Sequence, residues 1–286
     1  MSGSTRSLLN EGSDAWRLLK VAARDARVVV FCGIPGVGKS LLLREQARVA
    51  VAAGRKVSLL QWDVSRQAFE IPDVLRRYPE VAGATHVMIR RAVGLWSRNA
   101  LVDWIRAHPD PEHLLLIEAP LVGGRLAELA HRADDSAETL LSAADVRFYI
   151  PTPTVEVRLA IEAARRAETT THRHARDATN AIPTLVDELW EMVAQTALRL
   201  QLGSAESLSR YSPESYFAVY QRVLRHRTVS KVMVAEVVSA ADSPHDFDVP
   251  LEELIPSAAQ VAALLARAEH EGDESVAARA ALWYDT

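Results

Sequence analysis

The chain has 286 residues, of which 49% are hydrophobic and 24% are charged, so it can bury a sizeable core and has the composition of an ordinary globular protein. Its formal net charge of −4 disfavours a protein coated in nucleic acid, while leaving room for local basic patches. Because it contains no run of about 18 apolar residues and no apolar segment of signal-peptide type, we expect a cytoplasmic protein with no membrane partner.

The alternation of apolar runs with helical patterns predicts an α/β protein. An amphipathic helix is expected over 7–23 and the first buried strand over 28–32, where the single cysteine, Cys32, fits a small buried residue. Further strands are expected at 57–61, 114–117, 146–150 and 229–238. Helical patterns occupy 39–53, most of 64–113, 155–168, 183–202, 213–225 and 256–270. Because the strands are apolar throughout and are joined by helical segments, we predict a parallel sheet with helices on both faces.

The first strand leads into residues 33–40, GIPGVGKS, which fit the pattern G-x-x-x-x-G-K-[ST] of a phosphate-binding loop between a strand and a helix. Gly33 and Gly38 permit positive φ, so that backbone N–H groups and the helix N-terminus can face an anion. Lys39 would bind the β- and γ-phosphates, and the Ser40 hydroxyl would coordinate Mg²⁺. The predicted ATP site comprises Gly33, Gly36, Val37, Gly38, Lys39, Ser40 and Leu41. The alternative is a glycine-rich turn without a ligand.

The second strand ends at Asp63, and Arg66 follows one helical turn later. The carboxyl ends of the strands in an open parallel sheet line the ligand crevice, so Asp63 is expected on the same rim as the phosphate loop. A carboxylate there could deprotonate an acceptor hydroxyl for attack on the γ-phosphate, while Arg66 holds phosphate charge. In the alternative interpretation, Asp63 caps a helix and Arg66 lies on the surface.

The third strand ends at Glu118, a position where many NTPases have aspartate. Glu118 could hold Mg²⁺ through a bound water, or activate a water molecule as in hydrolytic ATPases, or serve only as a cap. His172 and His174 lie two residues apart in a polar stretch, but they lack the further ligands that a metal site needs.

The loop GIPGVGKS, followed one helix and one strand later by Asp-x-x-Arg at Asp63 and Arg66, resembles the P-loop kinases that phosphorylate hydroxyl groups. This group includes the kinase domain of polynucleotide kinase, seryl-tRNA kinase, zeta toxins and chloramphenicol phosphotransferase. The resemblance covers about residues 27–200. It implies that Lys39 and Ser40 bind ATP and Mg²⁺, that Asp63 is the general base, and that Arg66 contacts the acceptor or its phosphate.

In that family, a helix after the fourth strand carries arginines that reach the ATP phosphates from a lid. The corresponding arginines are Arg158, Arg165, Arg166, Arg173 and Arg176, of which Arg158 and Arg165 are assigned to ATP. For each of them the alternative is a solvated surface position.

A second group of arginines, within 64–113, would bind the acceptor. Its members are Arg76, Arg77, Arg90, Arg91, Arg98 and Arg106. The alternative is a solvated arginine face, with Trp96 and Trp104 in the core.

Together these features predict a three-layer P-loop NTPase fold. The N-terminal helix of 1–26 would pack on a kinase-like core at 27–202, which holds an acceptor segment at 64–113 and a helical lid at 158–181. An α-rich extension at 203–286 would complete the fold. The predicted function is transfer of the γ-phosphate of Mg-ATP to a hydroxyl of a small molecule or of a nucleic-acid end, the latter disfavoured by the net charge. The alternatives are a regulatory ATPase in which Glu118 activates water, and a nucleotide-binding scaffold without turnover.

Overall fold

The predicted parallel sheet is confirmed by the computed structural model, which describes residues 9–81, 83–167, 183–236, 247 and 249–286. Its strands are β1 (Val28–Cys32), β2 (Lys56–Gln61), β3 (His113–Ala119), β4 (Val146–Pro153), β5 (Val229–Val234) and β6 (Leu251–Glu253). In the described residues they form one six-stranded sheet in the order β5-β4-β1-β3-β2-β6. Every pairing in it is parallel.

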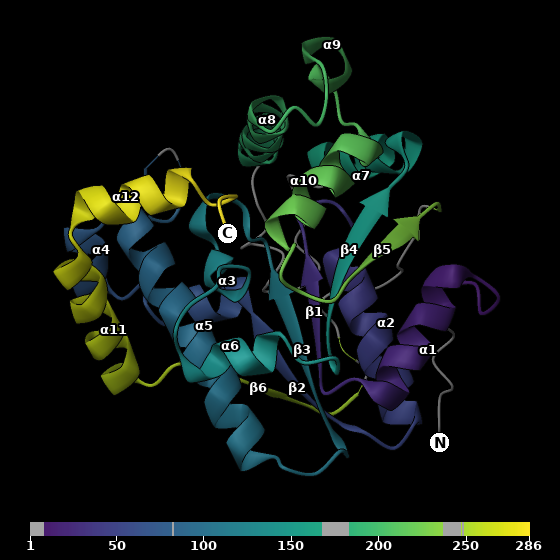
Figure 1. Cartoon of the computed structure of the whole chain (residues 1–286), viewed down its shortest axis with the longest axis horizontal. Coiled ribbons are helices and arrows are strands. Elements are labelled where there is room, and N and C mark those ends of the chain that lie inside the picture. Colours follow the sequence, from purple (N-terminus) through teal and green to yellow (C-terminus); the bar gives the residue numbers. More distant parts are fainter. Residues whose placement is uncertain (1–8, 82, 168–182, 237–246, 248) are drawn as a thin grey trace.

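Helices connect and cover these strands (Figure 1). They are α1 (Asp14–Asp25), α2 (Lys39–Ala52), α3 (Trp62–Gln67), α4 (Pro72–Arg77), α5 (Val87–Ala107), α6 (Ser136–Leu141), α7 (Val155–Ala167), α8 (Pro183–Arg199), α9 (Ala205–Leu208), α10 (Pro213–Val223), α11 (Ala258–Glu271) and α12 (Asp273–Ala281). Two short 3₁₀ turns, η1 (Val122–Gly124) and η2 (Ala127–Leu129), follow β3. None of the helices within the described ranges has the length and apolar content needed to cross a membrane.

The two faces of the sheet are covered by different helices, as the alternation of side chains along β1 shows. Val29 and Phe31 pack in one core with residues of α1 and α2. Val28, Val30 and Cys32 pack in the other core with residues of α5, α8, α10, α11 and α12. Since successive strand residues point to opposite faces, a strand that is buried along its whole length needs a cover on each side. The protein is therefore a three-layer α/β structure.

Helix α5 runs without interruption through Gly94. A Cβ at Gly94 would lie 1.7 Å from Oε2 of Glu128, so the glycine permits a close approach of η2 to the helix. Trp96 and Trp104 of the same helix are 2% and 4% exposed and belong to the core.

Both edges of the sheet come from the C-terminal region. β5 pairs with β4 at one edge, and β6 pairs with β2 at the other. β5 ends at Val234, before the expected end at 238. β6, α6 and α12 were not predicted, because β6 is only three residues long and neither helix follows a continuous apolar pattern.

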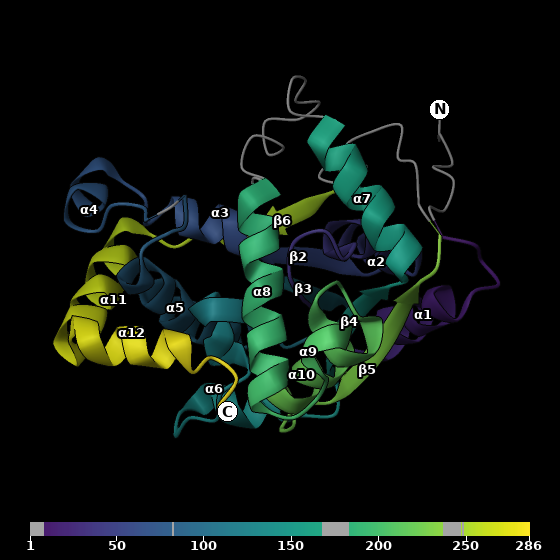
Figure 2. The same ribbon diagram turned by 90° about the horizontal axis from the view of Figure 1, so that it is seen from above.

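The carboxyl ends of the strands form the edge of the sheet at which the predicted site residues lie. From β1 the chain passes to β2 and returns to β3 beside β1, then crosses to β4 on the other side of β1. Ligand crevices in open parallel sheets lie at such a change of direction, outside the carboxyl ends. Helices α7, α8, α9 and α10 gather beyond the arrowheads of β1, β3 and β4 (Figure 1), and Figure 2 looks onto this edge. The predicted lid extends into 168–182, outside the described residues.

Candidate active site

The loop between β1 and α2 has the geometry expected for holding a phosphate. Gly36 and Gly38 adopt φ of 81° and 90°, a region that L side chains rarely enter. Backbone turns of this kind direct successive N–H groups toward one point. Gly38 is the N-cap of the 14-residue α2, and no side chain caps this helix end. The N-terminus of α2 can therefore serve an anion.

The neighbours of the loop hold it tightly. A Cβ at Gly33 would lie 2.1 Å from the Tyr216 hydroxyl of α10, and Val37 is fully buried. The guanidinium of Arg158, from α7, donates to the Pro35 carbonyl at 2.6 Å and pairs with Glu162 at 2.6 Å.

The structure describes the side chain of only one of the predicted lid arginines, Arg158. Arg158 is 1% exposed, so it lies under the loop and supports it instead of standing in solvent. The side chain of Arg165 lies outside the described residues, as do those of Arg166, Arg173 and Arg176. Leu41, in the first turn of α2, is half-buried.

Glu118 joins the two loop residues that were predicted to bind Mg²⁺ and phosphate. Its carboxylate accepts from the Ser40 hydroxyl at 3.3 Å and lies 3.6 Å from Nζ of Lys39. Lys39 also donates to the carbonyl of Ile34 at 3.1 Å, folding back over its own loop. Gln61, which is in register with Glu118 on the adjacent strand β2, donates to it at 3.2 Å.

These residues fit a magnesium ion. Mg²⁺ prefers hard oxygen ligands at about 2.0–2.1 Å, and adjacent corners of its octahedron are about 3 Å apart. The Ser40 hydroxyl and the Glu118 carboxylate present oxygens 3.3 Å apart at the end of β3, beside the loop. Among the described residues there is no cluster of three or more His, Cys, Asp or Glu side chains suited to a metal. A bound Mg²⁺ would thus need oxygens from its substrate as well.

Asp63 lies in the first turn of α3, and the N-cap of that helix is Gln61. Nε of Arg66 donates to Oδ1 of Asp63 at 3.0 Å, and the same guanidinium donates to both oxygens of Glu70 at 2.7 Å. Arg66 is only 14% exposed, so it is not the surface residue of the alternative interpretation. Arg66 thus fixes the orientation of the Asp63 carboxylate.

The surroundings of Asp63 suit a base. Its side chain is 46% exposed, so part of the carboxylate is open to solvent. Burial raises the pKa of Asp63, the Arg66 guanidinium lowers it, and the Glu118 carboxylate raises it again, with a net rise. Its Oδ2 accepts no hydrogen bond from any described residue, so it is available to a ligand.

The arginines predicted to bind the acceptor are divided by the structure. Most of the group are engaged elsewhere: Arg76 with Asp73, Arg77 with Glu269, Arg91 with Glu128 and Glu271, and Arg98 with Asp135 and Glu138. Arg106 is exposed near the end of α5. Only Arg90 lies near the rim, where its guanidinium donates to the carbonyl of Gly123 in the segment after β3. These paired members already have carboxylate partners within the protein, and acceptor binding by the group stays a prediction.

Sequence reasoning missed Arg125. This arginine is 6% exposed and follows β3 by six residues, and its ionisation is influenced by Arg90, Arg66 and Asp63. The signal available in the sequence was the glycine pair Gly123-Gly124 just before it, at the carboxyl end of a buried strand.

Comparisons with protein-family models, curated proteins and solved structures gave no match. The resemblance to hydroxyl-phosphorylating P-loop kinases therefore stays a prediction. What the geometry contributes is one rim on which the glycine loop, Glu118 and Asp63 come together.

Proposed function

We propose that this protein is an ATP-dependent phosphotransferase with a P-loop NTPase fold, which moves the γ-phosphate of Mg-ATP to a hydroxyl group. One observation carries the proposal. The loop that ends in Lys39 and Ser40 contacts Glu118, and Asp63, a carboxylate of raised pKa, stands at the end of the neighbouring strand β2.

Each side chain has a defined task in this proposal. The backbone of the glycine loop and Lys39 hold the phosphates of ATP, and Ser40 and Glu118 would hold Mg²⁺, which would supply positive charge to those phosphates. Asp63 accepts the proton of the acceptor hydroxyl through Oδ2, while that hydroxyl oxygen bonds to the γ-phosphorus. The bond from the γ-phosphorus to the bridging oxygen breaks, and ADP leaves with the electron pair. Arg66 keeps Asp63 in position through the hydrogen bond to Oδ1.

The alternative is a regulatory ATPase in which Glu118 activates water, and one contact favours it. Glu118 lies at a strand end beside Lys39, within reach of the phosphate loop. Against it stands the contact with Ser40, which occupies the Glu118 carboxylate in a position suited to Mg²⁺. The two functions differ in whether turnover needs an acceptor.

The test measures ADP release from Mg-ATP with and without pooled acceptors, namely nucleosides, sugars, sugar phosphates and 5′-hydroxyl oligonucleotides. For the wild type we expect release that depends on an acceptor. We expect Asp63→Asn to lower it by about 10²- to 10⁴-fold, the usual contribution of a general base. Asp73→Asn is the matched control, because Asp73 is an exposed aspartate in the neighbouring helix α4.

Three outcomes are informative. Loss of acceptor-dependent release in Asp63→Asn alone supports the phosphotransferase. Release that needs no acceptor, survives Asp63→Asn and disappears in Glu118→Gln shows the regulatory ATPase instead. Absence of ATP binding by the wild type would refute both functions.

A further inference from the structure

The segment after β3 has an unusual backbone. Within residues 121–126, here called the rim loop, Leu121, Gly123, Gly124 and Leu126 adopt φ of 61°, 61°, 81° and 60°. For leucine this conformation is unfavourable, yet both leucines are fully buried and so are held in place by packing. Backbone strain of this kind persists only where the surrounding structure enforces it, and it concentrates at functional sites.

Two arginine side chains converge on this rim loop. A Cβ at Gly123 would lie 3.0 Å from NH1 of Arg125 and 3.3 Å from NH1 of Arg90. Each guanidinium donates to one carbonyl of the loop, Arg90 to Gly123 and Arg125 to Val122. Nε of Arg90 is buried without a hydrogen-bond partner. The missing side chain of Gly123 thus permits both guanidinium groups to approach the same point of the rim loop.

Neither arginine forms an ion pair with a carboxylate of the described residues, although Arg125 is buried and Arg90 is partly buried. The buried Arg98 and Arg227, in contrast, both pair with Glu138. Burial lowers the pKa of Arg90 to about 10. Burial, together with the charges of Arg90 and Arg66, lowers the pKa of Arg125 to about 9. Placing uncompensated cations together in a protein interior is unfavourable, and an anion bound between them would relieve the cost.

We propose that Arg90 and Arg125 bind a phosphate group carried by the acceptor, so that the substrate is a phosphorylated small molecule whose hydroxyl faces Asp63. This inference rests on the proposed phosphotransferase function for the identity of the acceptor. Guanidinium groups match the geometry of phosphate oxygens and bind them with charge-assisted hydrogen bonds. Arg90 also borders a small hollow lined by Gly124, Ala127 and Ala280.

The first experiment uses calorimetric titration to measure the binding of inorganic phosphate, which serves as the probe. It is done in a Lys39→Ala background, which removes the cation of the phosphate loop. We expect phosphate binding to remain in this background and to weaken by about 10- to 100-fold when Arg125→Gln or Arg90→Met is added, the usual loss for hydrogen bonds to a charged group. Arg106→Gln, an exposed arginine on the same helix as Arg90, should leave binding unchanged. Equal binding with and without Arg125→Gln overturns the proposal, and so does complete loss in Lys39→Ala alone.

Thermal stability gives an independent measure and shows that the variants fold. Removing a strained, unpaired cation should leave the melting temperature of Arg125→Met equal to or above that of the wild type. Arg98→Met should lower it, because Arg98 pairs with Asp135 and Glu138. A large loss of stability in Arg125→Met would show a structural role and overturn the proposal.

Turnover then tests the acceptor itself. We expect phosphorylated acceptors to stimulate ADP release by the wild type and their unphosphorylated counterparts to fail. Arg125→Gln should raise the KM for the acceptor by about 10- to 100-fold, with the KM for ATP unchanged. Equal stimulation by unphosphorylated acceptors, or a raised KM for ATP alone, contradicts the proposal. If no acceptor stimulates release, the phosphotransferase function fails, while the phosphate titration still decides whether the arginine pair binds an anion.

Discussion

Asp63 stands between charges of opposite sign, and their balance decides the pH range in which it can act as a base. Burial and Glu118 raise its pKa, and Arg66 lowers it. A base works only when deprotonated, so activity should fall as the pH drops through the pKa of Asp63. Because that pKa is raised above the ordinary value for aspartate, about 3.9, the fall should come at a higher pH than for an ordinary carboxylate.

The dependence on Arg66 gives a prediction. Arg66→Met removes the cation that lowers the pKa of Asp63, so the acidic limb of kcat/KM against pH should move to higher pH than in the wild type. The measurement is acceptor-dependent ADP release over a series of buffers. Arg76→Met, an exposed arginine that pairs only with Asp73 among the described residues, is the control and should leave the limb in place. An acidic limb that Arg66→Met leaves unmoved would exclude Asp63 as the titrating base.

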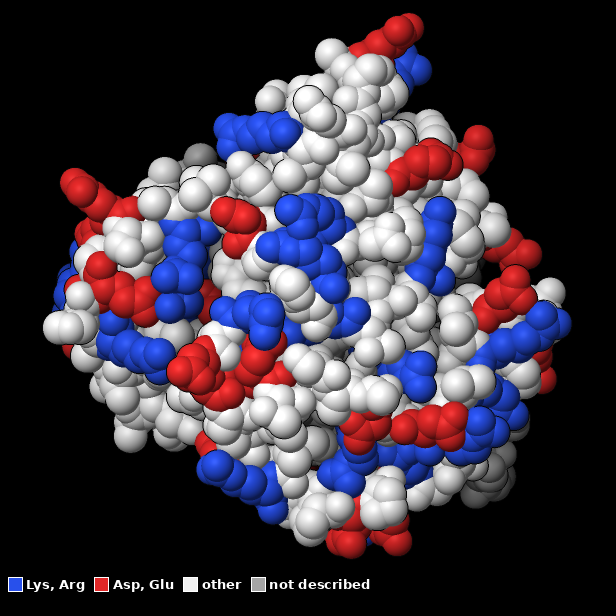
Figure 3. All heavy atoms as spheres, viewed as in Figure 1, with Lys and Arg blue, Asp and Glu red and all other residues white. Residues whose placement is uncertain are grey.

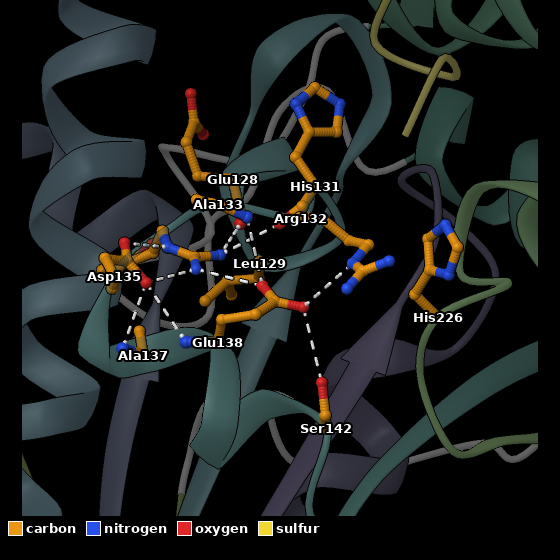
Figure 4. A network of polar contacts seen from close by, with 12 residues as sticks. Glu128, Leu129, His131, Arg132, Ala133, Asp135, Ala137, Glu138, Ser142 and His226 are labelled. Carbon is orange, nitrogen blue, oxygen red and sulfur yellow. Dashed lines mark hydrogen bonds and ion pairs between the residues drawn. The ribbon is translucent and has the colours of Figure 1, made fainter.

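At the scale of the elements, a network of ion pairs holds the segment that follows the rim loop (Figure 4). Glu138 of α6 accepts from Arg227, which precedes β5, at 2.8 and 3.1 Å, and from Arg98 of α5 at 3.2 Å. Both arginines also donate to backbone carbonyls of this segment, Arg227 to Leu129 and Arg98 to Glu128. The network therefore fixes the segment between β3 and α6 against two separate parts of the chain.

Glu138 makes this network dependent on pH. Burial alone would raise its pKa, but hydrogen bonds and charge from Arg227 and Arg98 lower it to about 2. A depressed pKa in the folded state contributes stability that is present above the unfolded pKa and is lost as the pH falls through the folded value. The contribution should therefore be complete above about pH 5 and should vanish toward pH 2.

The corresponding variant is Glu138→Gln. At neutral pH it should lower the free energy of unfolding by about 3 kcal/mol, because it leaves the fully buried Arg227 without its carboxylate. The difference from the wild type, measured by urea unfolding, should shrink steadily between pH 5 and pH 3. Asp134→Asn, an exposed carboxylate in the same segment, should show neither effect. A difference that stays constant over this pH range would show that folding does not lower the pKa of Glu138.

The sequence predicted those elements whose apolar residues are the ones that the fold buries. Strands β1 to β4 are apolar runs covered on both faces, and their positions followed directly from composition. The sequence pattern did not predict β6, because this three-residue edge strand is only partly buried. The sequence pattern did not single out Arg125, because its position beside Arg90 depends on how α5 packs against the rim loop. A local motif thus predicted the glycine loop, whereas groups of residues from distant segments could be brought together only by the fold.

At the scale of the whole molecule, charge is distributed unevenly despite the small net value. On the face drawn in Figure 3 both signs are interspersed, and basic side chains gather near its middle. Arg132 and Arg225 lie close enough to His226 to lower its pKa, together with burial, and Arg222 lies near Arg225. Local basic clusters of this kind are compatible with the net charge of −4.

The C-terminal helices share a core with the residues that support the candidate site. Neighbouring aromatic rings lead from Trp190 through Tyr211, Tyr216 and Tyr220 to Trp283, with centroid separations from 4.9 to 6.0 Å. Tyr216 touches Gly33 of the phosphate loop, and the Tyr220 hydroxyl donates to Pro120 beside the rim loop at 2.8 Å. The last helix is thereby packed into the same cluster that supports the candidate site.

A substitution of Trp283 tests whether the C-terminal helices share this core. Its side chain is 1% exposed, and its carbonyl accepts from Nε2 of His131 at 3.0 Å, so Trp283→Ala should lower the free energy of unfolding by about 3–5 kcal/mol. The adjacent Leu282 is 47% exposed, and Leu282→Ala should change it by about 0.5 kcal/mol or less. Urea unfolding followed by circular dichroism should show one transition in every variant, since one core cluster spans α5, α10 and Trp283. A separate early transition, or equal effects of the two substitutions, would mean that the C-terminal helices unfold independently and do not support the rim loop.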